Sequence, residues 1–131
     1  MAGDSGLSPE VRRLIAAQLA SMDHVEVLLL LHRSAPAALT QADAARETRR
    51  PVELLTVVMD DLVNGGLVSR AATPGRDDAY AYAPQSESLR RDVEQLVAVY
   101  NERPVTLIRA VYDRPPEPVT SFADAFRLRK G

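Results

Sequence analysis

Residues 39–84 constrain the fold of this chain more than any other segment, and they read LTQADAARETRRPVELLTVVMDDLVNGGLVSRAATPGRDDAYAYAP. Thr40 and Asp43 have the spacing of a capping box, in which each side chain bonds the backbone amide of the other residue, so a short helix is expected here. A tight basic turn follows this helix. Pro51 begins a second helix, because the residue before a proline disfavours the α region.

The second helix is predicted to lead into a β-hairpin. Its apolar residues recur at helical spacing and give it one inward face, formed by Leu55, Val58, Met59 and Leu62. Gly65 or Gly66 ends the helix, since glycine adopts a positive φ without strain. Short strands are expected at residues 67–70 and 79–82, on either side of a polar tip. This order of elements predicts a helix-turn-helix with a two-stranded β-wing.

Two helices are expected before this segment. Ser8 has the N-cap position of a helix that runs to about Ala20. Asp23 and Glu26 have the spacing of a capping box for the next helix, HVEVLLLLHR. A short apolar run of this kind is also compatible with a buried strand, but the cap and the leucine content favour a buried helix.

Residues 86–131 are predicted to add helices beyond the wing. Ser86 caps one of them, Pro104 interrupts it, VTLIRAVY continues as a further helix, and Ser121 caps a last short one. The fold class is therefore α+β and mostly α, with a winged helix-turn-helix over residues 1–85 and a C-terminal helical extension over residues 86–131. The two parts are expected to form a single structural unit, because 131 residues is the size of one domain.

Composition excludes several classes of protein. The chain has no cysteine, which rules out disulfides, thiolate metal sites and cysteine redox sensing. No secretory signal is apparent at the N-terminus, and the longest apolar run, residues 27–31, is far too short to span a bilayer. A cytoplasmic protein without membrane association is expected. The formal net charge of −2 weighs against strong non-specific binding to nucleic acids, which depends on cationic surfaces.

The helix-turn-helix resembles the winged-helix transcriptional regulators of bacteria, of the broad MarR type. The resemblance covers about residues 24–84 and is carried best by MDDLVNGGLV, which is similar to the end of that family's recognition helix and its first wing strand. It implies a DNA-binding transcriptional regulator whose helix 51–64 enters the major groove. Because winged helices also bind proteins, a protein-interaction module or adaptor that does not bind DNA is the alternative.

The resemblance also implies which residues contact DNA. The bases would face Arg49, Arg50, Glu53, Thr56 and Val57, with an arginine bonding guanine and Glu53 accepting from cytosine N4. Phosphates would be held at the start of the preceding helix and by the wing, through Thr40, Gln41, Arg70 and Arg76. The helix after Pro51 has no Lys or Arg, and without DNA binding the paired arginines would be solvated turn residues.

The C-terminal helices are expected to form the interface of a homodimer, as terminal helices do in the family it resembles. The apolar residues assigned to this interface are Leu89, Val93, Leu96, Tyr100, Leu107, Val111, Phe122 and Phe126. The alternative is intramolecular, because the same helices could cover the core of the winged helix itself. A two-fold dimer would place two recognition helices about one turn of DNA apart.

Nothing in the sequence indicates catalysis, a metal or a cofactor. His24 and His32 are eight residues apart, which on a helix gives directions that do not converge, so surface or helix-end roles are expected. The aspartate pairs at residues 60–61 and 77–78 lack any partner for acid–base chemistry and fit a solvated helix face and a turn. Neither a GxGxxG nor a GK[ST] loop is present. The protein is therefore not expected to be an enzyme.

Overall fold

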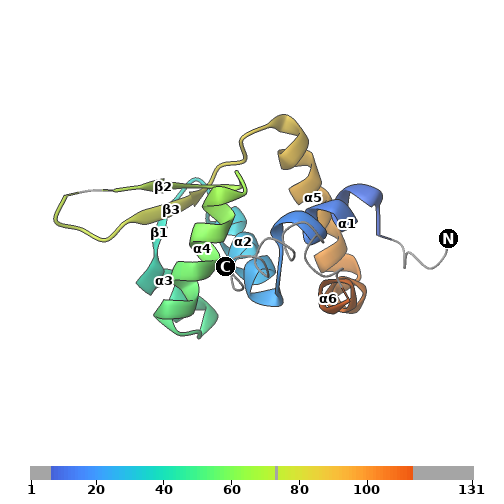
Figure 1. Ribbon diagram of the computed structural model, residues 1–131, viewed down its shortest axis with the longest axis horizontal. Helices are drawn as coiled ribbons and strands as arrows, with labels where there is room; N and C mark the ends of the chain where they lie inside the picture. Colours follow the sequence, from blue (N-terminus) through green and yellow to red (C-terminus); the bar gives the residue numbers. More distant parts are fainter. Residues whose placement is uncertain (1–6, 73, 114–131) are drawn as a thin grey trace, which may run out of the picture.

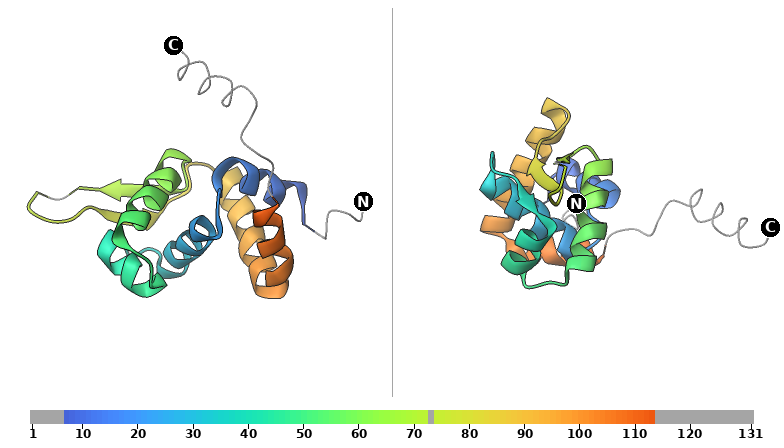
Figure 2. Two further views of the ribbon diagram at one scale, coloured as in Figure 1. Left: turned by 60° about the horizontal axis from the view of Figure 1, so that its bottom comes forward. Right: turned by 90° about the vertical axis from the view of Figure 1, so that its left-hand side faces the viewer.

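The computed structural model describes residues 7–72 and 74–113. Its elements are α1 (Pro9–Gln18), α2 (Met22–Ser34), β1 (Leu39–Thr40), α3 (Gln41–Thr48), α4 (Val52–Asn64), β2 (Val68–Ala71), β3 (Ala79–Tyr82), α5 (Glu87–Glu102) and α6 (Pro104–Tyr112). Helices α2, α3 and α4 pack together beside the small sheet, while α1, α5 and α6 form a second group (Figures 1 and 2). The mostly helical winged helix-turn-helix predicted from the sequence is confirmed.

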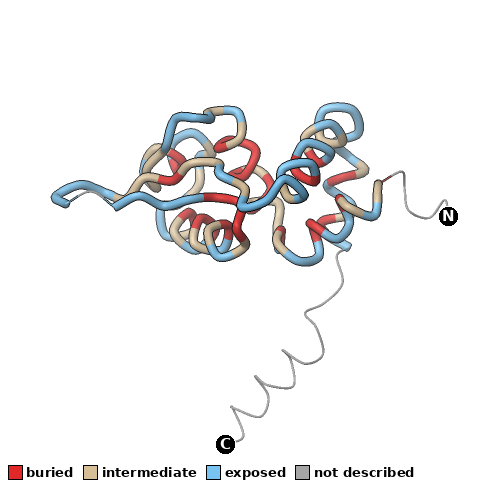
Figure 3. The backbone as a smooth tube through the Cα atoms, turned by 90° about the horizontal axis from the view of Figure 1, so that it is seen from above, coloured by how far each residue is buried: buried red, intermediate tan, exposed pale blue. Residues whose placement is uncertain are grey.

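The sheet has one strand more than predicted. The β2–β3 hairpin is the expected wing, but β1 pairs antiparallel with the other side of β3, which gives the order β1-β3-β2. Strand β1 has only two residues, which is too short for an alternating pattern, and Thr40 also serves as the N-cap of α3. The wing projects away from the helices, and much of its length is exposed (Figure 3).

The caps at both ends of the helix-turn-helix follow the sequence closely. The Thr40 hydroxyl accepts from the Asp43 amide at 3.0 Å, and the Asp43 carboxylate accepts from the Thr40 amide at 3.2 Å, so the predicted capping box is confirmed. At the end of α4, Gly66 has a φ of 80° and the amide of Leu67 donates to Leu62 O at 3.1 Å. This bond satisfies a carbonyl at the helix end, as in a Schellman motif.

The start of α2 differs from the prediction. Ser21 is the N-cap and its hydroxyl accepts from the His24 amide, so Asp23 and Glu26 do not form the expected capping box. A serine at this position satisfies the free amides of the first turn as well as an aspartate does. Both carboxylates are thereby free to bond another element. Helix α1 ends at Gln18, slightly earlier than predicted.

One core joins both groups of helices. All six helices and β3 contribute fully buried side chains, as does Leu19 after α1, and the largest of them include Leu19, Leu28, Leu55, Leu62, Tyr80, Leu96 and Leu107. The buried residues of the winged helix and of α5 and α6 thus belong to one cluster. Within the described residues, no single helix is long and apolar enough to cross a membrane. Helices α1 and α2 reach that length and apolar content only when they are taken together, and the chain bends sharply between them.

Candidate nucleic-acid interface

Helix α4 presents an outward face that is free of basic residues. Leu55, Val58, Met59 and Leu62 are buried beneath it, as predicted. The centre of the opposite face is formed by Glu53 and Val57, and Val57 is 57% exposed. Thr56, at the edge of this face, donates its hydroxyl to the carbonyl of Val52 at 3.2 Å. The predicted contact residues of α4 therefore offer DNA a carboxylate and a methyl surface.

Arg49 occupies the turn before α4 in a left-handed conformation, with a φ of 59° and a ψ of 45°. Its backbone amide bonds Ala45 O, which ends α3. The side chain is exposed and has no ion-pair partner among the described residues. This conformation costs an arginine roughly 1 kcal/mol more than a glycine. The guanidinium is therefore free to contact a ligand at the N-terminal end of α4.

Arg50 points in another direction, toward α2. Its guanidinium bonds Asp23, pairs with Glu26 at 3.0 Å and donates to Thr48 O at 3.1 Å. Burial opposes the charged form, but the bonds to both carboxylates outweigh burial and raise the pKa of Arg50. In this structure the side chain holds the α3–α4 turn against the start of α2, and it does not face outward toward the predicted base contact.

The start of α3 is also occupied by internal bonds. Gln41 Nε2 donates to the Tyr80 hydroxyl at 3.1 Å, which ties α3 to β3. The capping box already uses the amides of Thr40 and Asp43. The hydrogen bond from the Thr40 amide has the largest effect on the Asp43 carboxyl and the bond from Arg46 the next largest, and both hold its pKa below the usual range. A phosphate at this position would meet a carboxylate, so the predicted phosphate contacts of Thr40 and Gln41 are not favoured.

The wing supplies one paired and one unpaired cation. Arg70 lies 3.1 Å from Asp60 of α4 and 3.9 Å from Asp78 of the wing, so it links the hairpin to α4. Arg76 is exposed next to Gly75, whose φ of 77° shapes the tip, and it has no ion-pair partner within residues 74–113 or 7–72. The arginines of α3, the turn and the wing therefore do not form one continuous free cationic surface, because Arg50 and Arg70 are paired with carboxylates.

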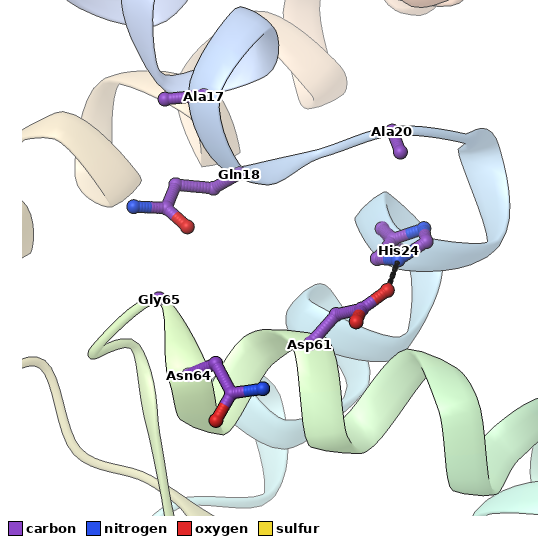
Figure 4. A pocket seen from close by; sticks show the side chains of 7 residues that line it. All are labelled: Ala17, Gln18, Ala20, His24, Asp61, Asn64 and Gly65. Carbon is purple, nitrogen blue, oxygen red and sulfur yellow. Dashed lines mark hydrogen bonds and ion pairs between the residues drawn. The ribbon is translucent and has the colours of Figure 1, made fainter. Parts of the chain in front are cut away.

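A small polar pocket lies behind α4, where the α1–α2 connection meets the C-terminal end of the helix (Figure 4). His24 is 7% exposed, and its ring bonds the Ser21 hydroxyl at 2.8 Å and the Asp61 carboxylate at 2.8 Å. Sequence reasoning missed this cross-link because its partners are 37 residues apart. Together with Arg50, it fixes both ends of α4 to the first turns of α2.

The C-terminal residues assigned to a dimer interface fall into three groups. Val93, Leu96, Leu107 and Val111 are at most 3% exposed within the single chain, so here they cover the chain's own core, as in the intramolecular alternative. Leu89 and Tyr100 are partly buried against that core. Phe122 and Phe126 lie outside the described residues. The exposed apolar residues of α6 are instead Val105, Ile108 and Tyr112.

This arrangement of helices, turn and hairpin is a winged helix-turn-helix. No protein-family model and no curated protein matches the sequence. Among solved structures, MepR, a transcription regulator of the Staphylococcus aureus multidrug efflux pump MepA, superposes with a TM-score of 0.52 at 18% identity, over 92% of this chain and 87% of MepR.

Two further structures give the same result. A MepR mutant bound to an oligodeoxyribonucleotide has a TM-score of 0.51 at 18% identity, over 92% of this chain and 87% of its own. A putative transcriptional regulator from Pseudomonas aeruginosa PA01 has a TM-score of 0.51 at 22% identity, over 92% and 79% respectively. These matches confirm the winged helix-turn-helix fold expected from the sequence.

Proposed function

We propose that this chain is a cytoplasmic, DNA-binding transcriptional regulator that inserts α4 into the major groove. The observation that carries the proposal is the placement of two exposed arginines without carboxylate partners, Arg49 before α4 and Arg76 at the wing tip. When a winged helix lies on DNA with its second helix in the major groove, cations at the start of that helix and at the wing tip can contact phosphates. The fold is shared with MepR, one structure of which contains an oligodeoxyribonucleotide.

The conformation of Arg49 supports the same role. Glycine would adopt its φ of 59° with less strain, so an arginine here has a cost that the fold does not require. Strained residues are frequent at functional sites because the side chain is needed at that place. A phosphate or guanine contact by Arg49 accounts for the cost.

A homodimer is the proposed form of the regulator. Val105, Ile108 and Tyr112 are spaced along one face of α6 and are 65%, 37% and 76% exposed. Apolar residues on an unpartnered helix face are suited to contact a second copy, and a two-fold dimer would present two α4 helices to one side of a duplex. No catalytic role is proposed for any part of the chain.

The alternative is a winged helix that binds a protein. It is favoured by the outward face of α4, where Glu53 and Val57 are exposed and the nearby Arg50 is held by α2. Selection of a randomised duplex library at low salt separates the two functions. The regulator retains specific duplexes, and Arg49→Ala with Arg76→Ala weakens their retention. If no duplex is retained at any salt concentration, DNA binding is refuted and the protein-binding function is favoured.

A further inference from the structure

We propose that α4 recognises the pyrimidine edges of base pairs, with Val57 contacting thymine methyl groups and Glu53 accepting a hydrogen bond from cytosine N4. The inference rests on the proposed DNA-binding function and specifies the chemistry of that site. It predicts that the strand facing α4 carries thymine and cytosine at the contacted positions.

The first argument is the set of side chains on α4, which has the sequence VELLTVVMDDLVN. Recognition of purines in the major groove needs donors, because guanine is bonded by Arg or Lys and adenine by Asn or Gln. The helix has no Lys, Arg or Gln, and its one Asn, Asn64, is its last residue. The N-terminal half of a recognition helix contacts the bases, so α4 brings no purine-specific side chain to them.

The second argument is the position of the two groups that α4 does offer. Glu53 and Val57 are four residues apart and lie on one outward face in the first two turns of the helix. Val57 is 57% exposed, and Glu53 has no ion-pair partner among the described residues. In the major groove, the thymine methyl is the apolar group and the cytosine N4 amine is a donor. The chemistry of both side chains thus matches a pyrimidine.

The third argument is electrostatic. The other two carboxylates on the solvent-facing side of α4 are held by internal partners, Asp60 by Arg70 at 3.1 Å and Asp61 by His24 at 2.8 Å. Glu53 remains as the carboxylate available to the groove. Phosphates repel an unpaired carboxylate, and a base that donates a hydrogen bond to Glu53 would offset this repulsion. The nearby Arg49 supplies the compensating positive charge at the entrance of the groove.

The test begins with duplexes that the wild-type protein retains in a randomised selection. Each thymine in the half-site is then replaced by deoxyuridine, which lacks only the methyl group. We expect about a fourfold loss of affinity for each contacted methyl. The Val57→Ala variant should be nearly insensitive to the same replacement. Repeating the selection with Glu53→Gln should change the preferred base from cytosine to adenine at one position, because glutamine bonds adenine.

Glu102→Gln is the matched control, since it makes the same change at an exposed residue at the far end of α5 and should leave the selected sequence unchanged. Retained duplexes whose affinity is unaffected by deoxyuridine, together with an unchanged preference in Glu53→Gln, would overturn the inference and leave DNA binding intact. Failure to retain any duplex would overturn both.

Discussion

Nη1 of Arg50 lies 3.0 Å from Oε1 of Glu26, so the arginine directly before α4 is bonded to the first turns of α2 instead of facing outward. Its neighbour Arg49 is exposed and adopts a left-handed conformation. Two adjacent arginines thus have separate roles, one in positioning α4 and one at the proposed contact with DNA.

Substitutions of Arg50 and Arg49 should have different effects on the free energy of unfolding. Arg50→Ala leaves Asp23 and Glu26 without their partner, and we expect it to lower the free energy of unfolding by about 1–3 kcal/mol. Arg49→Gly removes a strained conformation and should leave this free energy unchanged or raise it by up to about 1 kcal/mol. Urea denaturation measures both values. Equal losses in the two variants would contradict the separate roles.

The salt dependence of DNA affinity should change when Arg49 is replaced, and the Arg49 and Arg50 variants described above can be used to measure this change. Each phosphate contact contributes about 0.9 to the slope of log affinity against log salt concentration. Removing Arg49 should lower that slope by about 0.9 per bound chain. Arg50→Ala should retain the wild-type slope after correction for its folded fraction. A slope that is insensitive to Arg49 would show that this side chain does not contact a phosphate.

The two tyrosines of β3 allow a matched comparison of how removing a hydroxyl changes the stability of the fold. The Tyr80 hydroxyl accepts from Gln41 and donates to Asp60, so Tyr80→Phe should cost about 1 kcal/mol. The Tyr82 hydroxyl is buried without a hydrogen-bond partner in the described part of the chain, and this burial raises the pKa of Tyr82. Tyr82→Phe should therefore be neutral or stabilising in thermal unfolding. A loss as large as that of Tyr80→Phe would reveal a bond that the structure lacks.

Stability should depend on pH through the capping box of α3. The bond from the Thr40 amide lowers the pKa of Asp43 below the ordinary value of 3.8, so the stabilisation is present above 3.8 and is lost as pH falls through the lower folded value. Asp43→Asn should be less stable than wild type at neutral pH, and the gap should close in acid. Asp77→Asn, at the exposed wing tip, sets the baseline. A gap that widens in acid would be inconsistent with this cap.

The dimer prediction depends on the exposed face of α6. Ile108→Glu combined with Tyr112→Ser should convert a dimer to a monomer in light scattering at micromolar concentration, because a charge replaces an apolar contact. Val57→Glu introduces the same charge at an exposed valine on α4 and should leave the mass unchanged. A wild-type protein that is already monomeric would rule out the homodimer.

Local features were predictable from the sequence, and long-range partners were not. The Thr40–Asp43 cap and the stop at Gly66 depend on residues within one turn of each other. The bonds of Arg50 and His24 cross 27 and 37 residues, and no spacing rule connects such positions. The apolar residues of α5 and α6 were identified, but an amphipathic pattern does not indicate whether the same chain or a partner covers it.

The most direct measurement of the central claim uses the absence of cysteine in this chain. Val52→Cys places a single thiol on the exposed first turn of α4, and an attached DNA-cleaving chelate reports which bases it approaches. Ala98→Cys on α5, in the second group of helices (Figure 1), is the control. We predict cleavage confined to each half-site of a retained duplex by the Val52→Cys conjugate and none by the control. Equal cleavage by both conjugates, or none by Val52→Cys on a bound duplex, would contradict the insertion of α4 into the groove.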